Sequence, residues 1–145
     1  MPTRNATAVW EGGLQTGKGT FSGQMGALGG NYSFPSRFGD GAGGQTSPEE
    51  LIAAAHASCI AMALSAGLEK AGTPPTRVEA RAACTIEKVG DGFRVTRMAL
   101  TIRGAVPGVS AEQFVQAAEA AKVGCPISNA LNPSIQVTLD AKLEG

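Results

Sequence analysis

One segment of this 145-residue chain, Ser47–Ala71, predicts a helix that is apolar or small on every side. Its first residue is typical of a helix N-cap, Pro48 suits the first turn, and Glu50 completes a capping box. A glycine and two prolines after Ala71 end the pattern. A helix without a polar face belongs inside a protein, and in so small a chain it usually needs a sheet on one side and another cover on the other. A second subunit is the natural candidate for that cover. Its alanine content and internal polar residues favour a core helix over a membrane span.

The elements around this helix alternate between strand and helix patterns. Three short strands joined by glycine-rich turns are expected first, over Ala6–Glu11, Gly19–Ser22 and Asn31–Phe38, followed by a loop over Phe38–Gln45. After the long helix we expect a hairpin, two helices and a last strand, over Val78–Glu87, Phe93–Arg103, Ala111–Val123, Cys125–Leu131 and Ile135–Leu143. This order predicts an α+β fold with mainly antiparallel pairing, as a single domain of residues 1–145.

The charge balance and the cysteine count exclude several classes of function. Twelve basic residues balance twelve acidic ones, so no net field favours nucleic acid or an anionic membrane. The N-terminal residues 1–13 contain no apolar stretch typical of a signal peptide, which predicts a cytoplasmic, reducing location. Three cysteines do not form a closed disulfide framework.

The three cysteines have different surroundings. Cys84 lies on the apolar face of a strand pattern, where a buried structural cysteine is expected. Cys125 stands between two helices, where it either fills the junction or becomes a thiolate stabilised by backbone N–H groups. Cys59 lies within the apolar helix, where a core role is the simplest interpretation. A dyad of Cys59 with His56 is disfavoured because side chains three residues apart on one helix rarely align as nucleophile and base. A zinc site of Cys59, Cys125 and His56 is also disfavoured, because the sequence lacks the usual ligand spacing.

A longer pattern involves the same cysteines. The run TSPEELIAAAHASC, Thr46–Cys59, followed 66 residues after Cys59 by Gly-Cys-Pro around Cys125, resembles the OsmC/Ohr family of thiol peroxidases. Further matches at Trp10–Gly12, Arg37-Phe38 and Ala105–Gly108 extend the resemblance over essentially the whole chain. The position of Arg37 is similar to the OsmC branch, because the first glycine-rich turn lacks the arginine of the Ohr branch.

The resemblance implies a reductase of organic hydroperoxides and hydrogen peroxide in stress defence. Cys59 matches the peroxidatic cysteine, Cys125 the resolving cysteine, and Glu49 the acidic partner of Arg37. The implied fold is OsmC-like, with antiparallel sheets packed around a long buried central helix in an intertwined homodimer with sites at the subunit interface. No cofactor or metal is implied, and the reductant is an external dithiol, of lipoyl type in the Ohr branch.

Elementary chemistry is consistent with these roles. The Arg37 guanidinium can stabilise a Cys59 thiolate and hold a peroxide oxygen, and a bidentate carboxylate can fix its orientation. Glu49 precedes Cys59 by ten residues on one helix, so the two lie roughly 15 Å apart along its axis. If both serve one site with Arg37, Glu49 therefore comes from the other subunit. Glu50 stays open as an alternative partner of Arg37.

Two other functions stay open from the sequence. A non-enzymatic module could bind a lipid or another hydrophobic ligand in an apolar pocket lined by the buried helix and its methionine-rich surroundings. For a peroxidase, the width of the substrate pocket depends on how Met25, Phe34, Phe38 and Met62 pack. A general thiol–disulfide oxidoreductase is disfavoured because the chain has no Cys-x-x-Cys motif.

Overall fold

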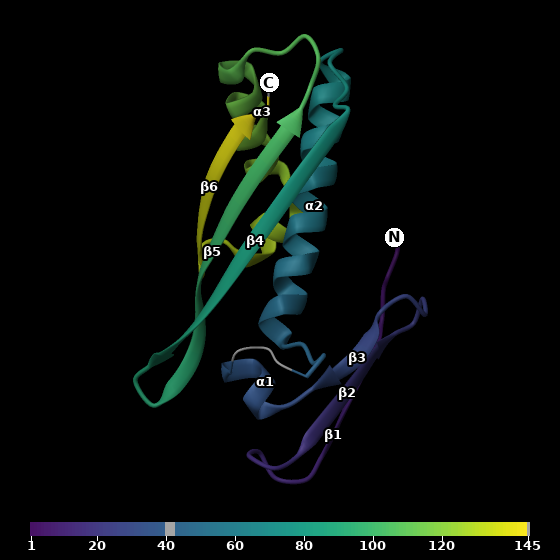
Figure 1. Cartoon of the computed structure of the whole chain (residues 1–145), viewed down its shortest axis with the longest axis vertical. Coiled ribbons are helices and arrows are strands. Elements are labelled where there is room, and N and C mark those ends of the chain that lie inside the picture. The colour runs from purple at the N-terminus through teal and green to yellow at the C-terminus, as the bar shows by residue number, and fades with distance from the viewer. Residues whose placement is uncertain (40–42, 145) are drawn as a thin grey trace. The chain divides into compact units, whose positions relative to one another are not determined.

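The chain forms two compact units, residues Met1–Leu51 and Ile52–Gly145, in a computed structural model that describes residues 1–39 and 43–144. The first unit contains three strands, one short helix and the start of the long helix. The second contains the rest of that helix, a second three-stranded sheet and two further helices (Figure 1). Part of the predicted loop over residues 38–45 lies outside the described residues.

An antiparallel sheet forms the first unit, in the order β1 (Ala6–Glu11), β2 (Lys18–Gly23), β3 (Gly29–Tyr32). Gly19 of β2 lies beneath two aromatic rings, since a Cβ atom there would lie 2.5 Å from the Tyr32 ring and 2.9 Å from the Trp10 ring. The two rings pack against each other with centroids 5.6 Å apart. The glycine of this strand therefore makes room for the aromatic face of the sheet.

The predicted strand over Asn31–Phe38 is wrong beyond Tyr32. The chain instead forms the helix α1 (Phe34–Phe38), because Ser33 acts as an N-cap whose hydroxyl accepts from the Ser36 N–H. The Ser36 hydroxyl lies 2.8 Å from the Ser33 N–H and completes a capping box. Pro35 suits the first turn.

The long helix α2 (Pro48–Lys70) begins and ends within one residue of the predicted bounds. Ser47 caps it by accepting the Glu50 N–H at 3.1 Å, and Gly72 ends it with a positive φ of 85°. By length and composition α2 would also pass for a membrane span. The expectation that it is buried on every side is not met in a single chain, because its buried residues are Glu49 in the first turn and one stripe at four-residue spacing: His56, Ile60, Leu64 and Leu68.

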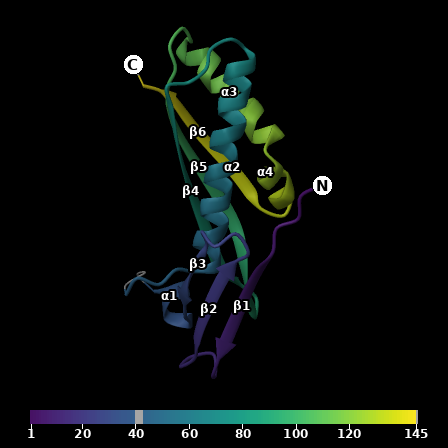
Figure 2. The same ribbon diagram turned by 90° about the vertical axis from the view of Figure 1, so that its right-hand side faces the viewer.

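A sheet of the order β4-β5-β6 forms the second unit, from β4 (Arg77–Val89), β5 (Gly92–Ala105) and β6 (Gln136–Leu143). β4 and β5 pair antiparallel, as predicted, with a register shift between Thr85 and Ile86. The helices α3 (Ala111–Gly124) and α4 (Pro126–Leu131) carry the chain back along β5. β6 therefore runs in the same direction as β5 and pairs with it in parallel. Figure 2 shows α2, α3 and α4 on the same face of this sheet.

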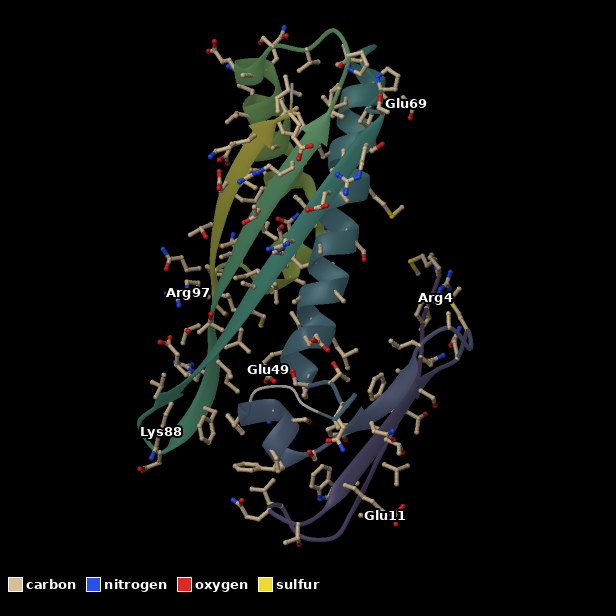
Figure 3. The ribbon with its side chains drawn as sticks, viewed as in Figure 1. Arg4, Glu11, Glu49, Glu69, Lys88 and Arg97 are labelled. Atoms are coloured by element: carbon tan, nitrogen blue, oxygen red, sulfur yellow. The ribbon has the colours of Figure 1, made fainter. Side chains whose placement is uncertain are left out.

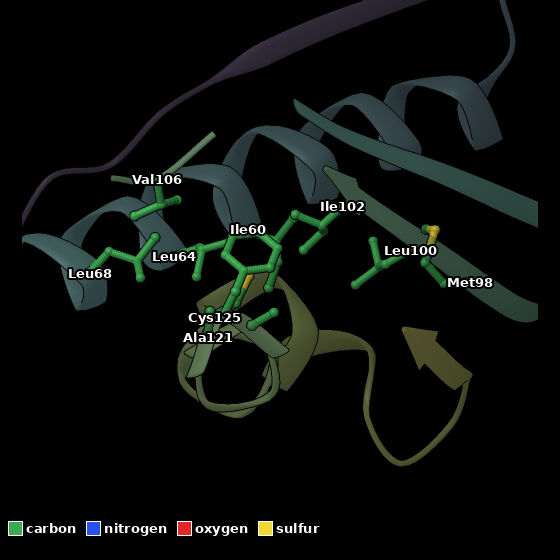
Figure 4. Close-up of a cluster of buried hydrophobic side chains, with 11 residues drawn as sticks. Ile60, Leu64, Leu68, Met98, Leu100, Ile102, Val106, Ala121 and Cys125 are labelled. Carbon is green, nitrogen blue, oxygen red and sulfur yellow. The ribbon is translucent and has the colours of Figure 1, made fainter. Parts of the chain in front are cut away.

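The hydrophobic core of the second unit lies between these helices and the sheet (Figure 4). Alternate residues of β5 and every fourth residue of α2 point into it, as the two periodicities require. Its buried members are Ile60, Leu64, Leu68, Met98, Leu100, Ile102, Val106, Phe114, Ala118, Ala121 and Cys125. One of the two candidate redox cysteines, Cys125, is therefore part of the core.

Replacement of Gly104 by alanine tests this packing. A Cβ atom at Gly104 on β5 would lie 2.4 Å from the ring of Phe114, which is completely buried and has no space to move. We expect Gly104→Ala to lower the free energy of unfolding by about 1–3 kcal/mol, measured by urea denaturation. Gly92→Ala is the matched control on the same strand, because nothing lies within 4 Å of its Cβ position. Equal stability of the two variants would contradict this account of the core.

Candidate active site

Two cysteines that are far apart in the sequence meet inside the second unit. The Sγ atoms of Cys59, in the middle of α2, and Cys125, between α3 and α4, lie 3.0 Å apart. Both are free thiols; Cys125 is completely buried and Cys59 is partly exposed. Because a disulfide bond is about 2.05 Å long, the sulfurs need to approach by only roughly 1 Å to be joined.

Backbone hydrogen bonds hold Cys125 at the junction of its two helices. Its N–H donates to the carbonyl of Ala121 at 2.8 Å and ends α3. Its own carbonyl accepts the Asn129 N–H at 3.0 Å, and Pro126 occupies the first turn of α4. The cysteine thus caps both helices, and its side chain points at α2.

The surroundings of the two sulfurs act on their pKa values in opposite directions. Burial raises the pKa of Cys59, and the contact with Cys125 raises it further against a weaker hydrogen bond from the Ile127 backbone. Burial also raises the pKa of Cys125, but its interactions with Cys59, Ser128 and Ile127 outweigh burial and lower this pKa below its usual value. Among the described residues of the second unit, no cation contributes to the pKa of Cys59. The second unit alone therefore favours the negative charge on Cys125, and a Cys59 thiolate needs a positive charge from outside it.

An arginine–carboxylate pair lies in the first unit. The Arg37 Nε atom lies 3.0 and 3.2 Å from the two carboxylate oxygens of Glu49, and Nη2 lies 2.7 Å from Oε1. Glu49 lies in the first turn of α2 (Figure 3). Its side chain is buried, whereas that of Arg37 is partly exposed. The pair uses the Nε and Nη2 edge of the guanidinium and leaves the Nη1 hydrogens for another acceptor.

Short hydrogen bonds hold α1 against the start of α2 and so place this pair. The Ser36 hydroxyl donates to the Thr46 carbonyl at 2.8 Å, and the Thr46 N–H donates to Asn31 of β3 at 3.0 Å. Glu50 is occupied elsewhere, because its carboxylate accepts the Thr46 hydroxyl. Of the two adjacent carboxylates that the sequence left open, the structure therefore pairs Glu49 with Arg37.

The four predicted site residues are thus brought together as two pairs, one in each unit. The sequence argument assigned Glu49 to a different subunit from Cys59 and left the chain of origin of Arg37 open. The structure pairs Arg37 with Glu49 of its own chain, and α2 is continuous from Pro48 to Lys70.

An apolar cavity of about 200 Å³ lies beside Arg37 in the first unit. Of the four residues that the sequence suggested for a pocket, only Phe34 lines it. The other lining residues are Trp10, Leu14, Tyr32, Ser33 and Pro48, together with Arg37 itself. Trp10 had been noted in the sequence as part of a motif, but nothing in the spacing placed it next to Arg37.

His56 makes no dyad with Cys59 and instead lies against α4. Its Nε2 atom lies 2.7 Å from the hydroxyl of Ser128, a residue that the sequence reasoning did not single out. Within residues 1–39 and 43–144, no group of three or more His, Cys, Asp or Glu side chains is arranged to hold a metal ion.

Comparison with known proteins finds close relatives. The family model described as "OsmC-like protein" matches residues 39–140. The chain is 44% identical over 142 residues to the "Peroxiredoxin OsmC" of Escherichia coli (strain K12), which covers 97% of this chain and 96% of that protein. It is 33% identical over 115 residues to the "Organic hydroperoxide resistance protein" of Xanthomonas axonopodis pv. citri (strain 306), over 78% of each chain.

Solved structures agree with the fold. The crystal structure of an organic hydroperoxide resistance protein from Elizabethkingia anophelis superposes with a TM-score of 0.78 at 28% identity, over 99% of this chain and 98% of that one. The α+β architecture, with two three-stranded sheets and a long central helix, is therefore shared with these proteins.

Proposed function

This chain belongs to the OsmC-like protein family, and we propose that it reduces hydroperoxides through Cys59 and Cys125. As a relative of peroxiredoxin OsmC it is a thiol-dependent peroxidase of hydroperoxides. The observation that carries the assignment of residues is the 3.0 Å approach of the two sulfurs. A peroxidatic cysteine needs a second thiol within reach of its oxidised sulfur, and Cys125 has this position.

In the first step the Cys59 thiolate attacks one oxygen of the hydroperoxide. The O–O bond breaks, the alkoxide leaves and takes a proton to become the alcohol, and Cys59 becomes a sulfenic acid. Hydrogen peroxide reacts in the same way and releases water. The partly exposed position of Cys59, beside the buried Cys125, suits the sulfur that meets the substrate.

In the second step the Cys125 sulfur attacks the Cys59 sulfur. The S–S bond forms as the S–O bond breaks, and the departing hydroxide combines with the proton from the Cys125 thiol to give water. The short distance between the sulfurs makes this step faster than further oxidation of Cys59. An external dithiol, of which a lipoyl group is the expected type, then reduces the disulfide by two thiol exchanges.

We infer that the thiolate of Cys59 is stabilised by Arg37 of a second copy of the chain. The second unit provides no cation for Cys59 among its described residues, and burial raises the pKa of this thiol. Arg37 is held by Glu49, which lies roughly 15 Å from Cys59 of its own chain along α2. A homodimer that exchanges the first units supplies the missing charge to each Cys59.

The exposed side of α2 also supports a dimer. The helix carries Met62 with 74% of its surface exposed, opposite the stripe that packs into the core. Ala54, Ala55 and Ala66 of the same helix are also exposed, and an apolar helix face of this kind suits contact with another chain. The two requirements, a cation at Cys59 and a cover for α2, are met by the same partner.

The cavity beside Arg37 suits the organic part of a hydroperoxide. Its walls are mostly aromatic and aliphatic, with Trp10, Leu14 and Phe34 among them, and Arg37 also lines it. An alkyl or aryl group in this cavity would leave the peroxide oxygens next to the Nη1 hydrogens of Arg37.

Variants of the three cysteines test the assignment of roles. We expect Cys59→Ser to abolish consumption of tert-butyl hydroperoxide in the presence of a dithiol, because it removes the nucleophile. Cys125→Ser is expected to complete one turnover and then stall with Cys59 over-oxidised, detected by mass spectrometry. Cys84→Ala is the control and keeps the wild-type rate, because Cys84 packs against the core of the sheet. Full activity of Cys59→Ser would contradict the mechanism, and a protein that only bound hydrophobic ligands would consume no peroxide in any variant.

Mixed dimers test the shared site. Cys59→Ser and Arg37→Met chains, each inactive alone, are unfolded together and refolded. If Arg37 acts on the partner's cysteine, each mixed dimer contains one intact site, so random mixing restores about a quarter of wild-type activity. If Arg37 acts within its own chain, no combination is intact and the mixture stays inactive, which would overturn the exchange. Refolded wild-type protein is the reference for recovery.

A further inference from the structure

A buried hydrogen bond connects two helices next to the cysteine pair. The His56 Nε2 atom on α2 and the Ser128 hydroxyl on α4 lie 2.7 Å apart, although 72 residues separate them in the sequence. Both side chains are almost completely buried in the second unit. The peroxidase mechanism described above assigns neither of them a role.

Ser128 also contacts the resolving cysteine. It follows Cys125 by three residues in the short helix α4, so its side chain returns to the sulfur. Ser128 is the third residue of the helix that Cys125 caps, and its hydroxyl and backbone N–H lower the pKa of the Cys125 thiol. A continuous series of contacts therefore leads from His56 through Ser128 and Cys125 to Cys59.

Only one placement of the protons on His56 and Ser128 gives each of their donors an acceptor. The Nδ1 atom of His56 is buried and has no hydrogen-bond partner. Burial lowers the pKa of His56, so the ring is neutral and carries a single proton. A proton on Nδ1 would be a buried donor without an acceptor, whereas a proton on Nε2 is donated to Ser128. The Ser128 hydroxyl, with its oxygen occupied by His56, then directs its own hydrogen to the Cys125 sulfur.

We propose that Ser128 stabilises the Cys125 thiolate for its attack on the Cys59 sulfenic acid, and that His56 is the positioning residue that orients the Ser128 hydroxyl. This inference rests on the proposed function of the two cysteines. In the step concerned, Cys125 forms the S–S bond, the S–O bond of Cys59 breaks, and the hydroxide released takes up the proton that the Cys125 thiol had lost. No oxidant or reductant beyond the sulfenic acid is needed.

The arrangement is more than core filling. A buried imidazole with one unpartnered nitrogen is less favourable than an aliphatic side chain of similar volume, because the lone nitrogen has lost its water. A hydrogen bond to a charged group is stronger than one to a neutral group, so the Ser128 bond gains strength when Cys125 ionises. That gain gives His56 a function at this place in the core.

Single-turnover kinetics test the proposal. Reduced protein is mixed with one equivalent of tert-butyl hydroperoxide, and the sulfenic acid on Cys59 and the Cys59–Cys125 disulfide are both quantified over time after trapping. We expect Ser128→Ala and His56→Met to slow disulfide formation roughly three- to tenfold relative to sulfenic acid formation, because the lost thiolate fraction is only partly offset by higher nucleophilicity. Ser128→Thr and His56→Gln keep the hydroxyl and the donor and should restore most of the rate. Asn129→Ala, an exposed neighbour on α4, is the control and should match the wild type.

A titration separates this role from a structural one. In a Cys59→Ser, Cys84→Ala background, the ultraviolet absorbance of the thiolate reports Cys125 alone. We expect Ser128→Ala to raise the pKa of Cys125, with Ser128→Thr closer to the parent protein. This measurement needs only a folded protein and no turnover.

The outcomes distinguish the two levels of the argument. If folded Ser128→Ala forms the disulfide at the wild-type rate and leaves the Cys125 titration unchanged, the inference is wrong and the peroxidase function stands. If the same loss appears in Ser128→Thr and His56→Gln, the hydroxyl and donor are not what matters and the inference is also wrong. If the wild-type protein forms neither the sulfenic acid nor the disulfide, the proposed function itself fails.

Discussion

The packing of α2 against α3 and β5 is the constraint on which the redox pair depends. Cys59 precedes Ile60, whose side chain is completely buried, and Cys125 is itself a member of the same core. Two sulfurs on separate elements stay 3.0 Å apart only if those elements do not slide, and a closely packed core resists such movement. Gly104 makes room for the Phe114 ring, and the buried stripe of α2 packs into the same core. Both therefore support the reaction of the two cysteines as well as the stability of the fold.

Each unit of the chain lacks what the other contains. The second unit has two thiols. Its surroundings lower the pKa of Cys125 and raise that of Cys59, so they favour a negative charge on Cys125. The first unit has a guanidinium held by a buried carboxylate, with one edge left for an anion, next to an apolar cavity. The proposed exchange between two copies joins the cation to the nucleophile. Ser128 and His56 on the other side of the pair then serve the second half of the cycle, in which Cys125 is the nucleophile.

Elements specified by local signals could be predicted from the sequence, and those set by distant contacts could not. The serine caps at positions 47 and 110 and the alternating β4–β5 hairpin placed those elements within a few residues. The strand expected over Asn31–Phe38 was wrong beyond Tyr32 because Ser33 caps a helix there, and the parallel pairing of β6 arises only from the α3–α4 crossover. The family resemblance named Cys59, Cys125, Arg37 and Glu49. It could not show which of Glu49 and Glu50 pairs with Arg37, because that choice depends on the hydrogen bond between the Thr46 hydroxyl and Glu50. It also could not find Ser128, because the partner of this residue, His56, lies 72 residues away in the sequence.

The most direct test of the central claim is the mass of the intact chain and of its peptides after one equivalent of tert-butyl hydroperoxide, without reductant. The account predicts that each chain loses two hydrogens and that a single cross-link joins the peptide of Cys59 to the peptide of Cys125 of the same chain, with Cys84 still a free thiol. A stable oxygen adduct on Cys59 without a cross-link, or a disulfide that includes Cys84 or joins two chains, would contradict it.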